Sequence, residues 1–183
     1  MLRRLLLLIL LFAAPALAQT TAIRAGNLID PATGAVTKNQ IILIKDGKIA
    51  EVGASVKIPA GAPVVDLSNS WVLPGLMDAH THMTLGGPAT GEALLEAEYL
   101  KASSALRALK GLRNAQDALM AGFTAVKDIG NDANFAAVDL RRAIERGWFD
   151  GPSMLTTGKI IAPYGGQSHG VPPEMCPFWR FEY

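Results

Sequence analysis

Short runs of apolar residues, separated by turn-forming residues, fill the stretch from residue 21 to residue 72. The runs occupy residues 22–25, 40–45, 48–52 and 64–67. Asp46-Gly47 lies between two of them and predicts a hairpin, because both positions of a type I′ turn need residues that tolerate a positive φ. We therefore predict a small β module over residues 19–74.

Beyond Pro74-Gly75 the pattern changes to one of alternating strands and helices. Runs that predict strands occupy residues 76–80, 123–129 and 154–162, and helical patterns occupy residues 92–121 and 134–146. This order is typical of parallel βα units rather than of an antiparallel meander. A closed (β/α)₈ barrel takes about 250 residues, and so we expect residues 75–183 to supply only its N-terminal part.

Each helical pattern predicts one buried face and a defined end. In the first pattern, apolar residues recur at gaps of four and three: Leu95, Tyr99, Ala102, Leu106 and Leu109. In the second pattern, similar spacing selects Ala137, Leu140 and Ile144. Gly122 and Gly147 follow the two patterns directly and predict the helix ends, because glycine readily adopts the left-handed conformation found there.

The composition is that of a folded protein with ordinary charge. Hydrophobic residues make up 50% of the chain and charged residues 18%, which is enough apolar material for one core. Two of the 17 basic residues lie in residues 1–18, so 15 remain against 16 acidic ones, and no excess of positive charge points to nucleic acid. The single cysteine, Cys176, excludes an intramolecular disulfide framework.

Residues 1–18 have the order of a cleaved signal peptide. Arg3-Arg4 precede an apolar run, and Ala16-Leu17-Ala18 supplies the small residues of a cleavage site. The apolar run is about half of the roughly 20 residues that a membrane span needs. We therefore favour cleavage after Ala18 over a membrane anchor, and expect a periplasmic or secreted protein without membrane attachment.

His80-Thr81-His82 stands at the end of the first strand predicted after Pro74. Residues i and i+2 of a strand project to the same side, so both imidazoles can face one point. Neutral imidazole is a good nitrogen ligand for Zn²⁺ and related divalent ions, and active sites of (β/α)₈ barrels lie at this end of the strands. On spacing alone, a metal site and a pair of structural histidines both remain open.

Four segments in order resemble the metal-dependent amidohydrolase superfamily. Residues 73–82, LPGLMDAHTH, resemble its hallmark strand, and residues 46–53, DGKIAEVG, are similar to the hairpin of its N-terminal β module. Residues 121–128, AGFTAVKD, resemble the second barrel strand of the imidazolonepropionase-like branch, which includes Xaa-Pro dipeptidases. Residues 151–158, and then residues 165–170, GGQSHG, are similar to that branch's third strand and glycine-rich loop.

The resemblance implies an α/β fold in which a small N-terminal β-sandwich module, residues 19–74, precedes the first βα units of an incomplete (β/α)₈ barrel, residues 75–183. It implies that His80 and His82 are ligands of a divalent metal, most readily Zn²⁺, with one or two ions in the complete protein. His169 is expected to contact substrate or to be an ordinary loop histidine. The general-base aspartate of the family is expected beyond Tyr183.

The function implied is metal-dependent hydrolysis of C–N bonds in a small molecule or dipeptide, and a homo-oligomer is compatible with it. Because two histidines are at most half of such a metal site, we expect this 183-residue chain alone to be inactive. The alternative is a non-catalytic exported remnant or small binding protein.

Overall fold

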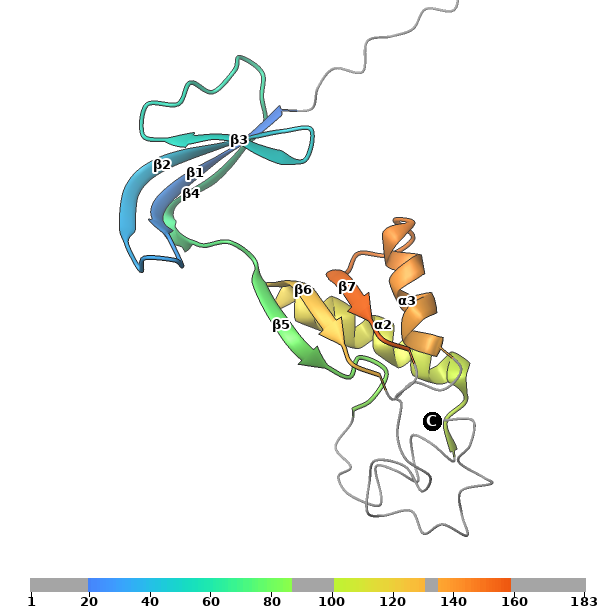
Figure 1. Cartoon of the computed structure of the whole chain (residues 1–183). Coiled ribbons are helices and arrows are strands. Elements are labelled where there is room, and N and C mark those ends of the chain that lie inside the picture. Colours follow the sequence, from blue (N-terminus) through green and yellow to red (C-terminus); the bar gives the residue numbers. More distant parts are fainter. Residues whose placement is uncertain (1–19, 87–100, 131–134, 159–183) are drawn as a thin grey trace, which may run out of the picture. The chain divides into compact units, whose positions relative to one another are not determined.

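The computed structural model describes residues 20–86, 101–130 and 135–158, shown in colour in Figure 1. The chain divides into two compact units between Pro74 and Gly75. The signal-peptide prediction, the first part of the predicted 92–121 helix and His169 lie outside the described residues.

The described part of the first unit contains one four-stranded sheet, with strand order β3-β2-β1-β4. Its strands are β1 (Thr20–Ile29), β2 (Val36–Lys45), β3 (Lys48–Gly53) and β4 (Val64–Val72). β1–β2 and β2–β3 are antiparallel, whereas β4 pairs parallel with β1. All four strands include the runs predicted from the sequence.

The β2–β3 turn has the predicted chemistry. Asp46 and Gly47 both have positive φ, at 51° and 73°, and Lys45 pairs with Lys48 across the turn. Such a turn matches the right-handed twist of the strands that it joins. The predicted hairpin is therefore confirmed.

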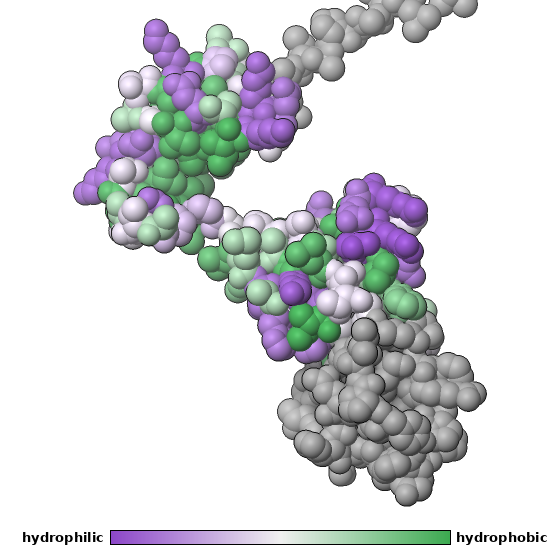
Figure 2. Space-filling view, viewed as in Figure 1, coloured by the Kyte–Doolittle hydropathy of each residue, from purple (hydrophilic) through white to green (hydrophobic). Residues whose placement is uncertain are grey.

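One face of this sheet carries an apolar groove of about 390 Å³. Isoleucines from three strands line it, among them Ile23, Ile42 and Ile49. Ile49 and Val52 are exposed there, with exposed fractions of 69% and 47%. Figure 2 shows hydrophobic residues gathered in the middle of this unit, with hydrophilic residues around them.

The second unit has a three-stranded parallel sheet with strand order β5-β6-β7. Its strands are β5 (Leu76–Thr81), β6 (Phe123–Asp128) and β7 (Ser153–Thr156). The connections carry α2 (Ser104–Met120) and α3 (Ala136–Glu145), and both helices lie on one face of the sheet (Figure 1). The predicted βα units are confirmed, although β7 ends at Thr156, earlier than expected.

The core of the second unit lies between this sheet and the two helices. It contains Met83, Ala115, Val126, Leu140 and Met154. Because α2, β6, α3 and β7 each supply one of these side chains, the small cluster joins both layers. Neither described helix combines the length and apolar character of a membrane span.

The buried face predicted for α3 is confirmed. Ala137 and Leu140 are buried, and Ile144 packs against the core. Gly147 follows the helix with φ 69°, and its N–H donates to the carbonyl of Ile144 at 2.8 Å. Strong apolar periodicity and a glycine stop were sufficient signals here.

The prediction of one continuous helix over residues 92–121 is wrong at Ser103, and the predicted buried face is wrong for the part that the structure describes. Ser103 has an extended backbone, and its hydroxyl accepts a hydrogen bond from the Leu106 N–H at 3.2 Å, so α2 begins there. Leu106 and Leu109 are exposed, whereas Gly111 and Ala115 are buried. The small residues face the core because a Cβ on Gly111 would already lie 3.0 Å from Cδ2 of Leu140.

Candidate metal centre

The two imidazoles of the His80-Thr81-His82 motif lie together at the C-terminal end of β5. His80 is the second-last residue of the strand, and His82 follows it. Their ring centroids are 5.5 Å apart, with an interplanar angle of 77°. The alternation of the strand places both side chains on one side, as expected from the sequence.

The ring of His82 has a defined hydrogen-bonding partner. Its Nδ1 lies 3.0 Å from the carbonyl oxygen of Gly130, in the loop after β6. A carbonyl oxygen can only accept, so Nδ1 carries the proton in this hydrogen bond. Nε2 of the neutral ring then keeps its lone pair and can bind a metal ion.

Two hydrogen bonds support the strand end that carries the histidines. The backbone N–H of His80 donates to Oδ1 of Asp78 at 3.0 Å. The hydroxyl of Thr81 donates to the carbonyl of Lys127 at 3.1 Å and so joins β5 to β6. Thr81 pairs with Asp128 in the sheet register. The end of β5 is thus fixed to its neighbour at the level of the motif.

Asp128, the last residue of β6, holds the segment that follows His82. Its side chain is fully buried. Oδ2 accepts from the Met83 N–H at 2.6 Å, and Oδ1 accepts from the Gly130 N–H at 3.0 Å. A carboxylate can accept several hydrogen bonds at once, and so it can anchor both loops.

The sequence reasoning missed Asn114, which holds the same segment from α2. Its side-chain amide donates to the carbonyls of Met83, at 2.8 Å, and Leu85, at 3.0 Å. Lys110, one turn earlier, donates to the carbonyl of Gly86 at 3.1 Å. The available signal was a polar residue beside Gly111 and Ala115, on the side of α2 where a close approach needs small side chains.

The histidine pair fits part of a metal site. Two imidazoles bound to one tetrahedral ion at about 2.0–2.1 Å have ring centres about 5 Å apart, close to the 5.5 Å found here. Within the described residues, no third His, Cys, Asp or Glu completes a metal-binding group. His80 and His82 can therefore hold a divalent ion only together with further ligands.

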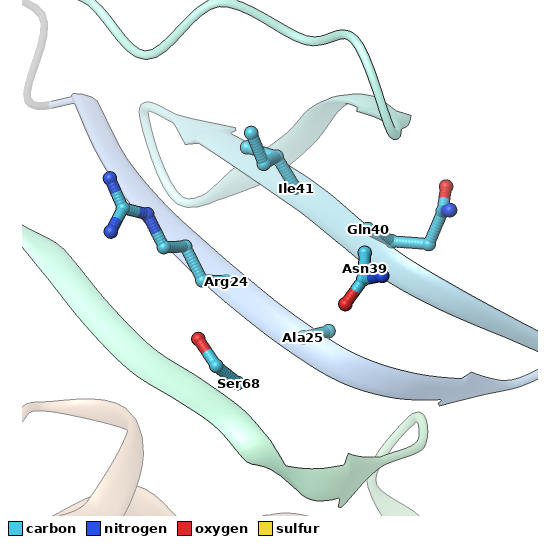
Figure 3. A pocket seen from close by; sticks show the side chains of 6 residues that line it. All are labelled: Arg24, Ala25, Asn39, Gln40, Ile41 and Ser68. Carbon is cyan, nitrogen blue, oxygen red and sulfur yellow. The ribbon is translucent and has the colours of Figure 1, made fainter.

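A second hollow, of about 230 Å³, lies on the first unit (Figure 3). Polar side chains line it, among them Arg24, Asn39 and Ser68, and all three are exposed. The Ser68 hydroxyl and N–H donate to the carboxylate of Asp66 and hold its pKa below the ordinary value, helped by the positive charge of Arg24. Among the described residues that line the hollow, none is a buried polar residue that would select a ligand.

Part of the chain is similar to dihydroorotases. The enzyme of Anaeromyxobacter sp. (strain K) is 46% identical over 61 residues, which are 33% of this chain and 14% of that enzyme. The enzyme of Pelotomaculum thermopropionicum is 43% identical over a stretch of the same length. No protein family model matches the sequence.

Solved structures of related enzymes match most of the chain. A Xaa-Pro dipeptidase with bound methionine is 31% identical, with a TM-score of 0.70, and the match covers 80% of this chain and 35% of that one. The resemblance to the N-terminal part of an amidohydrolase is confirmed. Molinate hydrolase, at 27% identity and a TM-score of 0.65, also shares this amidohydrolase fold.

The amidohydrolase relatives are considerably longer than the matched region. The chain spans 14% of the dihydroorotase and 35% of the dipeptidase. The matched part of the second unit corresponds to the beginning of an amidohydrolase barrel, which agrees with its three parallel strands. The relatives thus establish the fold class, an α/β protein with the first βα units of a (β/α)₈ barrel.

Proposed function

We propose that the protein is an exported, metal-dependent hydrolase of C–N bonds in which His80 and His82 are two of the metal ligands. The observation that carries this proposal is the pair of imidazoles 5.5 Å apart at the end of β5, with Nε2 of His82 available. Similarity to dihydroorotases, a Xaa-Pro dipeptidase and molinate hydrolase supports it. The names of these relatives point to different substrates. We therefore propose a small amide or dipeptide as the substrate class, with Xaa-Pro dipeptides as the first candidates.

A bound divalent ion, most readily Zn²⁺, would supply Lewis acidity toward a water molecule and a substrate carbonyl. This chain's contribution is to hold and orient the ion. Nε2 of His82 is directed by the hydrogen bond from Nδ1 to Gly130, and His80 is carried on the strand that Thr81 joins to β6. The proton-transfer group is proposed to lie beyond Tyr183.

Three further features belong to the proposal. Residues 1–18 act as a signal peptide that is cleaved after Ala18, so the protein works in the periplasm or outside the cell. Catalysis needs ligands in addition to His80 and His82, so a chain limited to these 183 residues is inactive. Its partner is a small-molecule substrate, and a homo-oligomer is compatible with the fold.

The test uses the protein purified from its native source. Its intact mass shows whether the chain begins at Gln19 and continues past Tyr183. Metal content is then measured for the recombinant form of that chain and for His80→Ala, His82→Ala and the control Asp139→Asn, a change at an exposed residue of α3. Activity is measured on Xaa-Pro dipeptides, N-acyl amino acids and cyclic amides.

The proposal expects bound metal and hydrolysis in the parent and the control, and loss of both in the two histidine variants. Normal metal content in both histidine variants would overturn the ligand assignment. A native chain that ends at Tyr183 and binds no metal would favour the non-catalytic alternative. A native chain that still contains residues 1–18 would contradict cleavage.

A further inference from the structure

We propose that Asp128 is a positioning residue that fixes His82 in the Nδ1–H tautomer. The consequence for metal binding rests on the function proposed above, whereas the tautomer itself does not. Asp128 accepts hydrogen bonds from backbone N–H groups near the imidazole. It acts through the two backbone segments on either side of the ring.

The carboxylate of Asp128 anchors the chain that carries His82. Oδ2 accepts from the N–H of Met83, the residue directly after His82, at 2.6 Å. Met83 and Thr84 are buried, and Asn114 holds the carbonyl of Met83 from α2 at 2.8 Å. The backbone that leaves His82 is therefore held on both its N–H and its C=O side.

The same carboxylate anchors the group that accepts the His82 proton. Oδ1 accepts from the N–H of Gly130 at 3.0 Å, and the carbonyl of Gly130 lies 3.0 Å from Nδ1 of His82. Gly130 has φ 108°, a conformation that other residues rarely adopt. One buried side chain thus sets the position of both the ring and its hydrogen-bond acceptor.

The arrangement predicts the effect of replacing the Asp128 carboxylate with an amide of nearly the same size. Asp128 uses one oxygen for Met83 and the other for Gly130, and both partners are donors. An asparagine has one acceptor oxygen and places its amide N–H groups against the second donor. Asp128→Asn therefore releases one of the two anchors while it preserves the size of the side chain.

The experiment reads the tautomer directly by ¹⁵N NMR of the histidine rings in the metal-free complete protein, in alkaline buffer. His82 is identified by the signal lost in His82→Asn. We expect the parent and the exposed-site control Asp139→Asn to show the Nδ1–H form at His82. Asp128→Asn is expected to show a mixture that contains the Nε2–H form, with Zn²⁺ affinity lower by about 10- to 100-fold.

Two results would overturn the proposal: an Nε2–H form at His82 in the parent, or an unchanged Nδ1–H form in folded Asp128→Asn. If Asp128→Asn does not fold, the proposal is tested on the parent protein alone. Hydrogen-bond couplings from the Met83 and Gly130 N–H groups to the Asp128 carboxylate must then be present, and absence of either overturns it. An Nδ1–H tautomer in a protein that binds no Zn²⁺ would contradict the proposed function and leave the positioning role intact.

Discussion

Gly26 in β1 lies against the backbone carbonyl of Ser68 in β4, so closely that a Cβ on Gly26 would overlap the carbonyl oxygen. The register of the parallel β1–β4 pair shifts at this point, from Ala25 opposite Leu67 to Asn27 opposite Trp71. β4 thus bulges toward β1, and a glycine fills the narrow place. Gly26 does not have a positive φ, so a glycine is required here because of the close approach of the Ser68 carbonyl and not because of the backbone conformation.

Gly26→Ala should destabilise the first unit by about 1–3 kcal/mol, because backbone must move to admit the methyl group. Hydrogen exchange of residues 20–72, read by mass spectrometry, measures the effect. Gly53→Ala is the matched control, since a Cβ there meets only Cγ2 of Val56, at an ordinary 3.4 Å. Equal exchange in both variants would show that the close approach is absent.

Leu140→Ala should destabilise the second unit by about 2–5 kcal/mol, because a buried side chain is removed from the core that joins sheet and helices. Leu109→Ala should change stability by no more than about 0.5 kcal/mol, since Leu109 is 65% exposed. Urea unfolding followed by segment-resolved hydrogen exchange compares the two. A larger loss of stability in Leu109→Ala than in Leu140→Ala would show that Leu109 lies on the buried face, as the sequence predicted.

Asn114→Ala should loosen the segment after His82. Two hydrogen bonds to backbone carbonyls are lost, each worth about 0.5–1.5 kcal/mol. The amide of Leu85, which donates to the carbonyl of His82 at 3.1 Å, should then exchange about 10-fold faster or more. Asp117→Ala, at an exposed site on the same helix, is the control, and the same acceleration there would count against a specific clamp.

Ser68→Ala should raise the pKa of Asp66 toward its ordinary value, because the Ser68 hydroxyl is the largest cause of the depressed pKa. With the folded-state pKa lowered, the carboxylate stabilises the fold above its unfolded-state pKa. That contribution is lost as the pH falls through the folded-state pKa. A ¹³C NMR titration measures the pKa of Asp66 in the parent and in Ser68→Ala. Asp30, whose pKa is lowered by Thr33, should be unaffected and serves as the internal reference.

Local chemistry explains why some elements could be predicted. Asp46-Gly47 specifies its turn whatever surrounds it, and the apolar residues of α3 match the helical period. The face of α2 could not be predicted in this way, because Gly111 and Ala115 are buried for their small size rather than for their hydrophobicity. Periodicity does not record how closely two elements approach.

The candidate site shows the same division. The side-by-side placement of His80 and His82 follows from strand alternation alone. The hydrogen bonds that Asn114 donates and Asp128 accepts depend on how the loop after β5 packs against α2 and β6, segments that are distant in sequence. No sequence motif indicates how these segments pack together.

The parallel pairing of β4 with β1 sets an order for the folding of the first unit. The β2–β3 hairpin needs only local contacts and can form within about 1–10 μs. Val64 reaches Ala22 only after the intervening chain has closed a long loop, which is slower because its entropy cost comes before any contact is gained. A chain still emerging during synthesis therefore presents the edge of β1 unpaired until residue 64 and the strand that follows have appeared.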